Sequence, residues 1–374
     1  MKGNITRRGK NSWRIKFDVE GEPGSGRQTR FVTVRGTKKE AQIEAAKIIA
    51  AASKGEYVDG SKETVAEFVT RWLQDWAIGN TSNKTYSRYE ELLRLHLVPN
   101  LGTKRLQRLR ATDLQSIYAT LQRERGLAAR TVLHLHRVVH RMLRHAAQWS
   151  VVHQNVATLV DAPSVQDAEI DILTPSEVQA VLRTLKGRPI YALATVALGT
   201  GMRRGEILAL RWQDVELDGA LLRVERSLEQ TKTHGLVFKA PKTKHGRRTI
   251  TLPPSTVTEL RNHWRAQQEL RLAMGLGRAN DALVFGEEDG SPRSPNAVTK
   301  AWAKAMTTAG IEATLHSLRH THASTLIASG LDVLTISRRL GHGSPAITLK
   351  VYGHLFKTDD RAAAIMEAAF AGTD

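Results

Sequence analysis

Residues 12–20 alternate between polar and apolar side chains. The apolar ones fall at every second position: Trp13, Ile15, Phe17 and Val19. This is the period of a strand with one buried face. A turn at 22–26, another strand at 30–34 and an Ala- and Ile-rich helix from about 38 to 53 are expected to follow. The N-terminal segment therefore predicts a small sheet with one helix packed on it.

From residue 64 to about 160 the apolar side chains recur every three or four positions, as they do on the buried face of a helix. The first such face comprises Val65, Phe68, Val69 and Trp72. A second helix carries leucines within 92–97, and the segment 99–102 is expected to break it. Thr112 or Asp113 is expected to cap a third helix.

A fourth helix is predicted over about 128–149, and its basic residues follow a regular pattern. They lie four, three, four and three positions apart: Arg130, His134, Arg137, Arg141 and Arg144. Such spacing places them in one continuous stripe along the helix. The stripe could track a DNA backbone or groove, or it could be an ordinary solvated face.

After a linker at 161–171, Thr174-Pro175-Ser176-Glu177 is typical of a helix start. Helices are expected through residue 198 and again over 203–212. Short strands are predicted at 221–226, 236–240 and 247–252, with helices dominating from 255 onward. The predicted fold class is multidomain and mainly α with small β-sheets, divided into domains at 1–57, 63–160 and 170–374.

The chain of 374 residues carries a net charge of +18 and has a pI of about 10.3. The excess of Lys and Arg is spread over the whole length, which favours a polyanionic partner such as nucleic acid. A basic surface could also keep the protein soluble or bind anionic membranes. The absence of cysteine excludes disulfide and thiolate chemistry. The N-terminus has no apolar signal-peptide core, and the apolar run at 190–198 is too short to span a bilayer, so a cytosolic protein is expected.

Arg203 follows Thr200-Gly201-Met202 at the expected first turn of a helix. Exposed N–H groups and the helix dipole favour an anion there, and a guanidinium adds a two-pronged clamp. Arg204 would point about 100° away around the helix, so Arg203 is the candidate. Glu206, three residues on, could hold Arg203 in place. The alternative is an Arg pair on a solvated surface.

His316 and Arg319 are three residues apart, so one helical face can bring both to a single phosphate. Arg319 would supply a second clamp, and His316 could donate a hydrogen bond or relay a proton. His320 and His322 lie nearby and raise the possibility of a metal site. We expect no metal, because the chain has no cysteine and no adjacent carboxylate completes a ligand set.

Tyr352 lies near the carboxyl end, two turns into a helix expected to start at Ser344-Pro345. His342, in the Gly341-His342-Gly343 turn, precedes it. Lys242 lies between two predicted strands, where a hairpin loop could carry its ammonium group to a leaving oxygen. Lys244 is a rival candidate for the same role. The alternative is that the segment is a plain basic turn with no role in catalysis. Breaking a phosphodiester with a phenol of pKa about 10 requires deprotonation, anion stabilisation and a proton for the departing oxygen.

In order and spacing, these residues resemble the tyrosine recombinases of the phage integrase type. The motif Thr-Gly-x-Arg-x-x-Glu is matched at 200–206, His-x-x-Arg at 316–319 and Leu-Gly-His at 340–342. Lys242 matches the family's hairpin lysine, and Tyr352 its nucleophile. The resemblance covers about 170–374, and 64–160 is more loosely similar to the family's core-binding domain.

The resemblance implies a mechanism and partners. A tyrosine attacks a phosphate of duplex DNA to give a 3′-phosphotyrosine, and four protomers exchange strands between two duplexes. The covalent intermediate conserves bond energy, so no cofactor is implied. A DNA-bending accessory protein and an excision factor are further expected partners. The C-terminal segment 360–370 is expected to dock either on a neighbouring protomer or on its own domain.

The first 55 or so residues resemble the arm-binding domain of integrases that use two kinds of DNA site, a three-stranded sheet with one helix. Arg7, Arg8 and Lys10 are the candidate DNA contacts there. This favours an integrase that inserts or excises a prophage or mobile element. The alternatives are a catalytically silent DNA-binding regulator with the same fold and a topoisomerase with similar chemistry.

Overall fold

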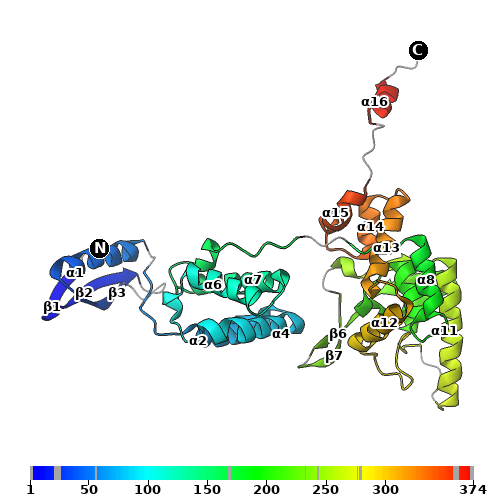
Figure 1. Ribbon diagram of the computed structural model, residues 1–374, viewed down its shortest axis with the longest axis horizontal. Helices are drawn as coiled ribbons and strands as arrows, with labels where there is room; N and C mark the ends of the chain where they lie inside the picture. Colours follow the sequence, from blue (N-terminus) through cyan, green and yellow to red (C-terminus); the bar gives the residue numbers. More distant parts are fainter. Residues whose placement is uncertain are drawn as a thin grey trace. The chain divides into compact units, whose positions relative to one another are not determined.

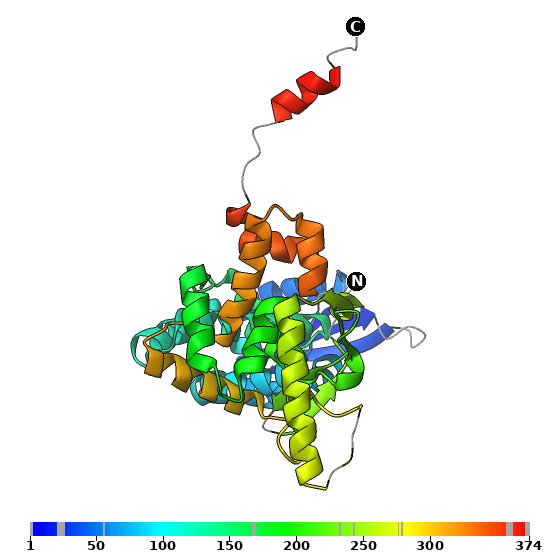
Figure 2. The same cartoon turned by 90° about the vertical axis from the view of Figure 1, so that its right-hand side faces the viewer.

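The structure is a computed structural model, and it describes residues 3–20, 27–54, 57–166, 170–231, 233–241, 244–275, 277, 280–356 and 362–370. The chain divides into two compact units, Met1–Asp167 and Ala168–Asp374 (Figures 1 and 2). Each unit has hydrophobic clusters of its own. No helix in the described part of the chain is long and apolar enough to cross a bilayer.

The first unit opens with an antiparallel sheet in the order β1-β2-β3, followed by one helix. The elements are β1 Asn4–Gly9, β2 Ser12–Glu20, β3 Arg27–Arg35 and α1 Lys38–Ser53. Ile15 and Phe17 of β2 pack against Ala45 and Ala52 of α1, as the alternation predicted. β1 lies at the sheet edge and carries a single half-buried apolar residue, Ile5, so its apolar pattern is weak.

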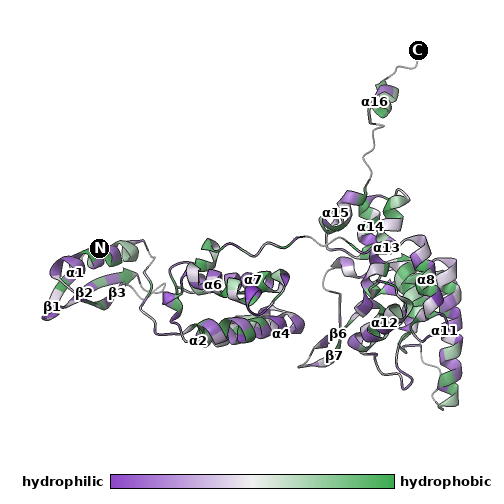
Figure 3. Cartoon of the chain, in the orientation of Figure 1, coloured by the Kyte–Doolittle hydropathy of each residue, from purple (hydrophilic) through white to green (hydrophobic). Residues whose placement is uncertain are grey.

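Helices form the rest of the first unit. They are α2 Val65–Trp72, η1 Leu73–Ala77, α3 Ile78–Asn80, α4 Asn83–Leu92, η2 Leu93–Leu97, α5 Val98–Leu101, η3 Leu106–Arg108, α6 Ala111–Arg123, α7 Ala129–Gln148 and η4 Val156–Leu159. The predicted apolar face of α2 is buried in their common core. Figure 3 shows hydrophobic and hydrophilic colours side by side on these helices, as expected where one face is buried.

The second helix continues through Pro99 and ends at Leu101, within the predicted break at 99–102. One local prediction in this unit is wrong. The cap position of α6 is Arg110, not Thr112 or Asp113. Asp113 instead occupies the third helical position, where its carboxylate accepts a hydrogen bond of 2.8 Å from the Arg110 backbone.

The second unit is mainly helical. Its helices are α8 Pro175–Leu185, α9 Tyr191–Thr200, α10 Arg204–Leu208, α11 Pro254–Ala273, α12 Pro295–Ala309, α13 Leu315–Ala328, α14 Val333–Leu340, α15 Pro345–Tyr352 and α16 Ala362–Phe370. Thr174 caps α8, with proline at its first position, as predicted. The helix expected over 203–212 is much shorter, because Leu210 and Trp212 turn into the core and the backbone pairs with residues 282–284.

The strands of this unit form two separate small sheets. One has the order β4-β5-β8, with β4 Val215–Glu216, β5 Leu221–Val224 and β8 Arg248–Thr251. The other pairs β6 Ser227–Thr231 with β7 Gly235–Lys239. The three predicted strands are present, but β6 was not predicted, since Leu228 is its one buried apolar side chain.

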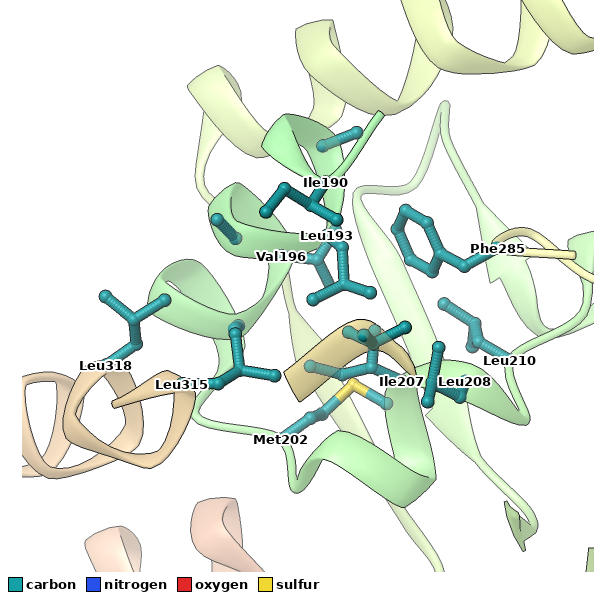
Figure 4. Packing of buried hydrophobic residues seen from close by; sticks show 14 of the residues in the cluster. Ile190, Leu193, Val196, Met202, Ile207, Leu208, Leu210, Phe285, Leu315 and Leu318 are labelled. Atoms are coloured by element: carbon teal, nitrogen blue, oxygen red, sulfur yellow. The ribbon is translucent and has the colours of Figure 1, made fainter. Parts of the chain in front are cut away.

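The main core of the second unit is assembled from segments far apart in the sequence. Figure 4 shows Leu193 and Val196 of α9, Ile207 of α10 and Phe285 converging from separate elements, with Leu318 of α13 nearby. All five side chains are buried. Burial of these apolar surfaces is the main stabilisation of the framework that carries α10 and α13.

We expect Leu193→Ala to lower the free energy of unfolding of the second unit by about 2–5 kcal/mol, because it leaves a cavity in a closely packed core. Leu272→Ala is the matched control, since Leu272 is 62% exposed on α11. The control should change stability by less than about 0.5 kcal/mol. Calorimetry of the full chain measures both, and equal effects of the two substitutions would contradict this assignment of the core.

Candidate active site

Arg203 is the cap residue of α10. Its backbone is extended (φ −74°, ψ 148°), so it precedes the helix instead of lying in the first turn as predicted. Glu206 holds it twice: the Arg203 N–H donates to Oε2 at 3.0 Å and Nη1 donates to Oε1 at 2.9 Å. The Glu206 side chain is 4% exposed, whereas that of Arg203 is 42% exposed. The guanidinium is therefore anchored on one side and open to solvent on the other.

Arg319 projects from α13 and is buried. Its Nη1 donates to the Gly201 carbonyl at 2.5 Å and its Nη2 to the Leu340 carbonyl at 2.9 Å. Burial and, second, the charge of Arg203 lower the pKa of Arg319 to about 9, so the group remains cationic at neutral pH. Because Gly201 caps α9 and Leu340 ends α14, the guanidinium ties three helices together.

Gly201 has a left-handed backbone, with φ of 64°. A Cβ atom built on it would lie 2.6 Å from the His322 ring. Glycine therefore lets the loop approach α13 closely enough for its carbonyl to meet Arg319.

His342 lies in the turn after α14 and is buried. Its Nδ1 is 2.8 Å from Oγ1 of Thr348, a residue of α15. The Gly341 carbonyl beside it accepts a hydrogen bond of 3.2 Å from Nη2 of Arg203. Burial, followed by the charges of Arg319 and Arg203, lowers the pKa of His342 to about 3, so the imidazole is neutral at physiological pH.

Tyr352 is the last residue of α15, and its side chain is 1% exposed. Its hydroxyl lies 2.8 Å from Nδ1 of His320. Burial raises the pKa of the phenol, while the charges of Arg319 and Arg203 act in the opposite direction. Both cations are thus close enough to act on the hydroxyl, and the phenol stays protonated in the DNA-free protein.

His316 lies one turn before His320 on α13 and is exposed. The two imidazole rings meet edge to face, with centroids 4.6 Å apart. Although the residue as a whole is exposed, its ring loses hydration where it lies against its neighbours, and this, followed by the charges of Arg319 and Arg203, lowers the pKa of His316. The structure therefore gathers Arg203, His316, Arg319, His342 and Tyr352 around one region of the second unit.

Lys242 falls outside the described residues, as does the side chain of its rival Lys244. The flanking strands do not pair with each other, since β7 pairs with β6 and β8 pairs with β5. The expected hairpin between the strands on either side of Lys242 is therefore wrong. The unpredicted strand β6 pairs with β7, so the chain passes from one sheet to another between β7 and β8.

Sequence reasoning missed Arg248 on β8. Its Nη2 donates to Oε2 of Glu206 at 2.8 Å, and its Nε donates to the Arg339 carbonyl at 2.7 Å. Its side chain is 6% exposed. Arg248 lies two residues before the buried Ile250, so strand alternation placed it on the inward face, and this was the available signal.

His322 and Arg339 were also missed as structural partners. His322 Nδ1 lies 2.7 Å from the Leu198 carbonyl, and its Nε2 accepts a hydrogen bond of 3.0 Å from Nε of Arg339. Both ring nitrogens are therefore occupied. Within the described ranges, no cluster of His, Asp and Glu has the arrangement of a metal site.

The predicted basic stripe lies on the exposed face of α7: Arg130, His134, Arg137, Arg141 and Arg144 are all exposed. Arg141 donates to the Tyr89 hydroxyl at 2.8 Å. The stripe borders a groove of about 220 Å³ that is also lined by Arg88 and Leu92.

Arg7, Arg8 and Lys10 lie on β1 and the turn after it, and all three are exposed. Arg7 donates to the Gly9 carbonyl at 3.2 Å and lies 5.9 Å from the centre of the Trp13 ring. The free edge of the sheet therefore presents a cationic surface.

We expect Glu206→Gln to destabilise the second unit by about 3–5 kcal/mol, because Arg248 would keep a buried charge without its carboxylate. Burial by itself raises the pKa of Glu206, but the hydrogen bond and charge of Arg248, and then Arg203, bring it below the ordinary value. The stabilisation is thus present above the unfolded pKa of about 4.3 and is lost as pH falls through the lower folded pKa.

The difference in melting temperature between wild type and Glu206→Gln should therefore shrink as the pH is lowered below about 4. Glu288→Gln, a change at an exposed residue of the same unit, is the control. A difference that stays constant down to strongly acidic pH would show that the carboxylate charge is not the stabilising element.

Comparison with known protein families gives two matches. Residues 171–359 match the Phage integrase family, and residues 64–122 match the N-terminal SAM-like domain of phage integrases. Together they cover the helical region of the first unit from α2 into α6, but not α7, and most of the second unit.

Named relatives match over most of the chain. A XerC-like tyrosine recombinase of Caldanaerobacter subterraneus subsp. tengcongensis is 26% identical over 373 residues, which is 95% of each chain. An integrase of Streptomyces ambofaciens is 30% identical over 328 residues, covering 84% of this chain and 82% of that protein.

Solved structures share the fold. The Tn1549 transposon integrase, in complex with transposon right end DNA, superimposes with a TM-score of 0.68 at 20% identity, covering 82% of this chain and 99% of that one. A lambda integrase dimer bound to a core site gives a TM-score of 0.58 over 96% of this chain and 95% of that one, at 15% identity. The chain thus belongs to the phage integrase family and is a tyrosine site-specific recombinase.

Proposed function

We propose that Tyr352 is the nucleophile that attacks a phosphate of duplex DNA. The observation that carries the proposal is the setting of its hydroxyl, which is buried, hydrogen-bonded and acted on by the charges of Arg203 and Arg319. Attack forms a bond between the phenolic oxygen and phosphorus and releases a 5′-hydroxyl. The product is a 3′-phosphotyrosine that a second 5′-hydroxyl can attack to rejoin the strands.

Arg203 and Arg319 bind the non-bridging oxygens in this scheme. Glu206 fixes one guanidinium, and the carbonyls of Gly201 and Leu340 fix the other, so little reorganisation is needed as charge develops. His316 and His342 complete the pocket as hydrogen-bond donors to the same phosphate. Lys242 donates the proton that the departing 5′ oxygen requires.

The exposed stripe on α7 and the cationic edge of the N-terminal sheet support three roles along the chain. Residues 1–57 bind an arm-type DNA site through Arg7, Arg8 and Lys10. Residues 63–160 bind the core site through the stripe on α7, and residues 170–374 carry out catalysis.

The reaction requires two duplexes, so the active assembly is a homotetramer on DNA. Ile365, Met366 and Phe370 of α16 are 59%, 53% and 77% exposed. These apolar side chains support docking of the tail, either on a neighbouring protomer or on the same protomer. The names of the relatives, which are integrases of bacteria and of a phage, support integration of a prophage or mobile element. Excision, a place in the bacterial cytoplasm, and a DNA-bending protein and an excision factor as further partners belong to the same proposal and rest on the resemblance to the family.

Tyr352→Phe should abolish the covalent protein–DNA adduct formed on a suicide duplex while leaving binding intact. The duplex carries the core site mapped at the junctions of the element that encodes the chain. Tyr191→Phe, in the same unit, is the matched control and should retain the adduct. If Tyr352→Phe still formed the adduct, another residue would be the nucleophile. If the wild type bound the duplex without cleaving it, the protein would be a catalytically silent regulator.

Arg203→Ala and Arg319→Ala should each slow cleavage about 10²–10³-fold, as expected for the loss of one group that stabilises developing charge. Single-turnover adduct formation measures the rate, and a gel shift with the same duplex verifies that the variant binds. A rate within about twofold of wild type would remove that arginine from the site.

The α7 stripe is tested by the salt dependence of binding. Arg137→Ala and Arg144→Ala should each reduce the slope of log K against log salt by about 0.9, because each removes one phosphate contact. Arg123→Ala, an exposed arginine on α6, is the control and should leave the slope unchanged. A random-sequence duplex suffices as the probe, and unchanged slopes in both stripe variants would make the stripe a solvated face.

A further inference from the structure

The hydroxyl of Tyr352 is hydrogen-bonded to His320, a residue with no role in the mechanism proposed above. His320 lies immediately after Arg319 on α13, and its Nδ1 is 2.8 Å from the phenolic oxygen. The two rings meet edge to face, with centroids 5.7 Å apart. His320 is thus in direct contact with the atom that attacks phosphorus.

The surroundings of His320 favour its neutral form. On α13, its own helix, the neighbouring groups are His316 and the guanidinium of Arg319. On α15 its neighbour is Tyr352. The carboxylate of Asp171, in the segment before α8, acts on it through its negative charge. A hydrogen bond of 2.9 Å from the Leu173 N–H to Oγ1 of Thr321 holds that segment against α13.

Burial, followed by the charges of His316 and Arg319, lowers the pKa of His320 to about 4, although Asp171 acts in the opposite direction. A neutral imidazole has one nitrogen that accepts and one that donates. In the tautomer that carries its proton on Nε2, Nδ1 accepts the hydrogen bond of the protonated phenol, and this is the tautomer used below.

We propose that His320 is a catalytic residue that accepts the proton of Tyr352 as the phenolic oxygen attacks the phosphate. The inference rests on the proposed role of Tyr352 as nucleophile. As the bond between the phenolic oxygen and phosphorus forms, the O–H bond breaks and its proton moves to Nδ1, leaving an imidazolium. The 5′ oxygen departs with a proton from Lys242. In rejoining, the attacking 5′-hydroxyl gives its proton back to the Lys242 amine, and the imidazolium returns its proton to the phenolic oxygen as the bond between that oxygen and phosphorus breaks.

Proton transfer is strongly unfavourable before DNA binds, since the phenol is a weaker acid than usual and the imidazole a weak base. A bound phosphate diester changes both conditions. Its negative charge offsets Arg319, which depresses the basicity of His320, and bonding to phosphorus makes the phenolic oxygen a weaker base. The pair therefore transfers the proton during attack and not in the resting protein.

The other histidines of the site are less suited to this step. Nδ1 of His342 is occupied by Thr348, and both nitrogens of His322 are bound within the protein. His316 is exposed, and its ring meets that of His320 rather than the phenol. This leaves His316 and His342 available to the phosphate and His320 to the nucleophile.

Two substitutions separate proton acceptance from positioning. His320→Asn retains an oxygen that can accept the hydrogen bond but cannot take up the proton, whereas His320→Ala removes both functions. Single-turnover adduct formation is measured on the suicide duplex described above, with binding and melting temperature determined for each variant. His354→Asn, which changes an exposed histidine two residues beyond Tyr352, is the matched control.

We expect both His320 variants to bind the duplex normally and to form the adduct about 10²-fold or more slowly, the contribution typical of a general base. Added imidazole should restore part of the rate of His320→Ala, increasingly so as its free-base fraction rises with pH. His354→Asn should match wild type.

A wild-type rate in His320→Asn would overturn the inference, because the hydrogen bond alone would then suffice. Failure of imidazole to restore any activity to a folded, DNA-binding His320→Ala would also overturn it. Neither result affects the role of Tyr352. An adduct in Tyr352→Phe would instead overturn the proposed function itself, so the two failures are distinguishable.

Discussion

The site depends on one carboxylate that lies between two guanidinium groups. Glu206 accepts hydrogen bonds from Arg203 at 2.9 Å and from Arg248 at 2.8 Å, and it is almost fully buried. Cations gathered in a protein interior repel one another and lose their hydration. A single buried anion reduces both costs and still leaves Arg203 open on the side where a phosphate would bind.

For the buried Arg319, backbone carbonyls replace the hydration that the guanidinium loses. Arg319 donates to Gly201 and Leu340, which lie at the carboxyl ends of α9 and α14, where the helix dipole concentrates negative charge. These partners are fixed by the fold and cannot rotate away as a flexible carboxylate could. The guanidinium of Arg319 thus both holds α9, α13 and α14 together and supplies a positive charge to the site.

Burial, assisted by the same cations, keeps the neighbouring histidines neutral. The pKa values of His320 and His342 fall to about 4 and about 3, mainly through burial and secondarily through nearby positive charge. Neutral imidazoles can accept protons, whereas the guanidiniums remain charged. The site therefore separates permanent charge for binding an anion from groups able to exchange protons, although all of them lie in one small region.

The sequence by itself determined the local elements and the spacing of the candidate residues. Strand alternation in β2, the cap of α8 and the helical period of α7 depend on near neighbours, so a linear pattern suffices for them. Only the tertiary structure decided that Arg248 joins Glu206, that β7 pairs with β6 and not with β8, and that His320 contacts Tyr352. These contacts join residues that only packing of the core brings together, and no local periodicity encodes them.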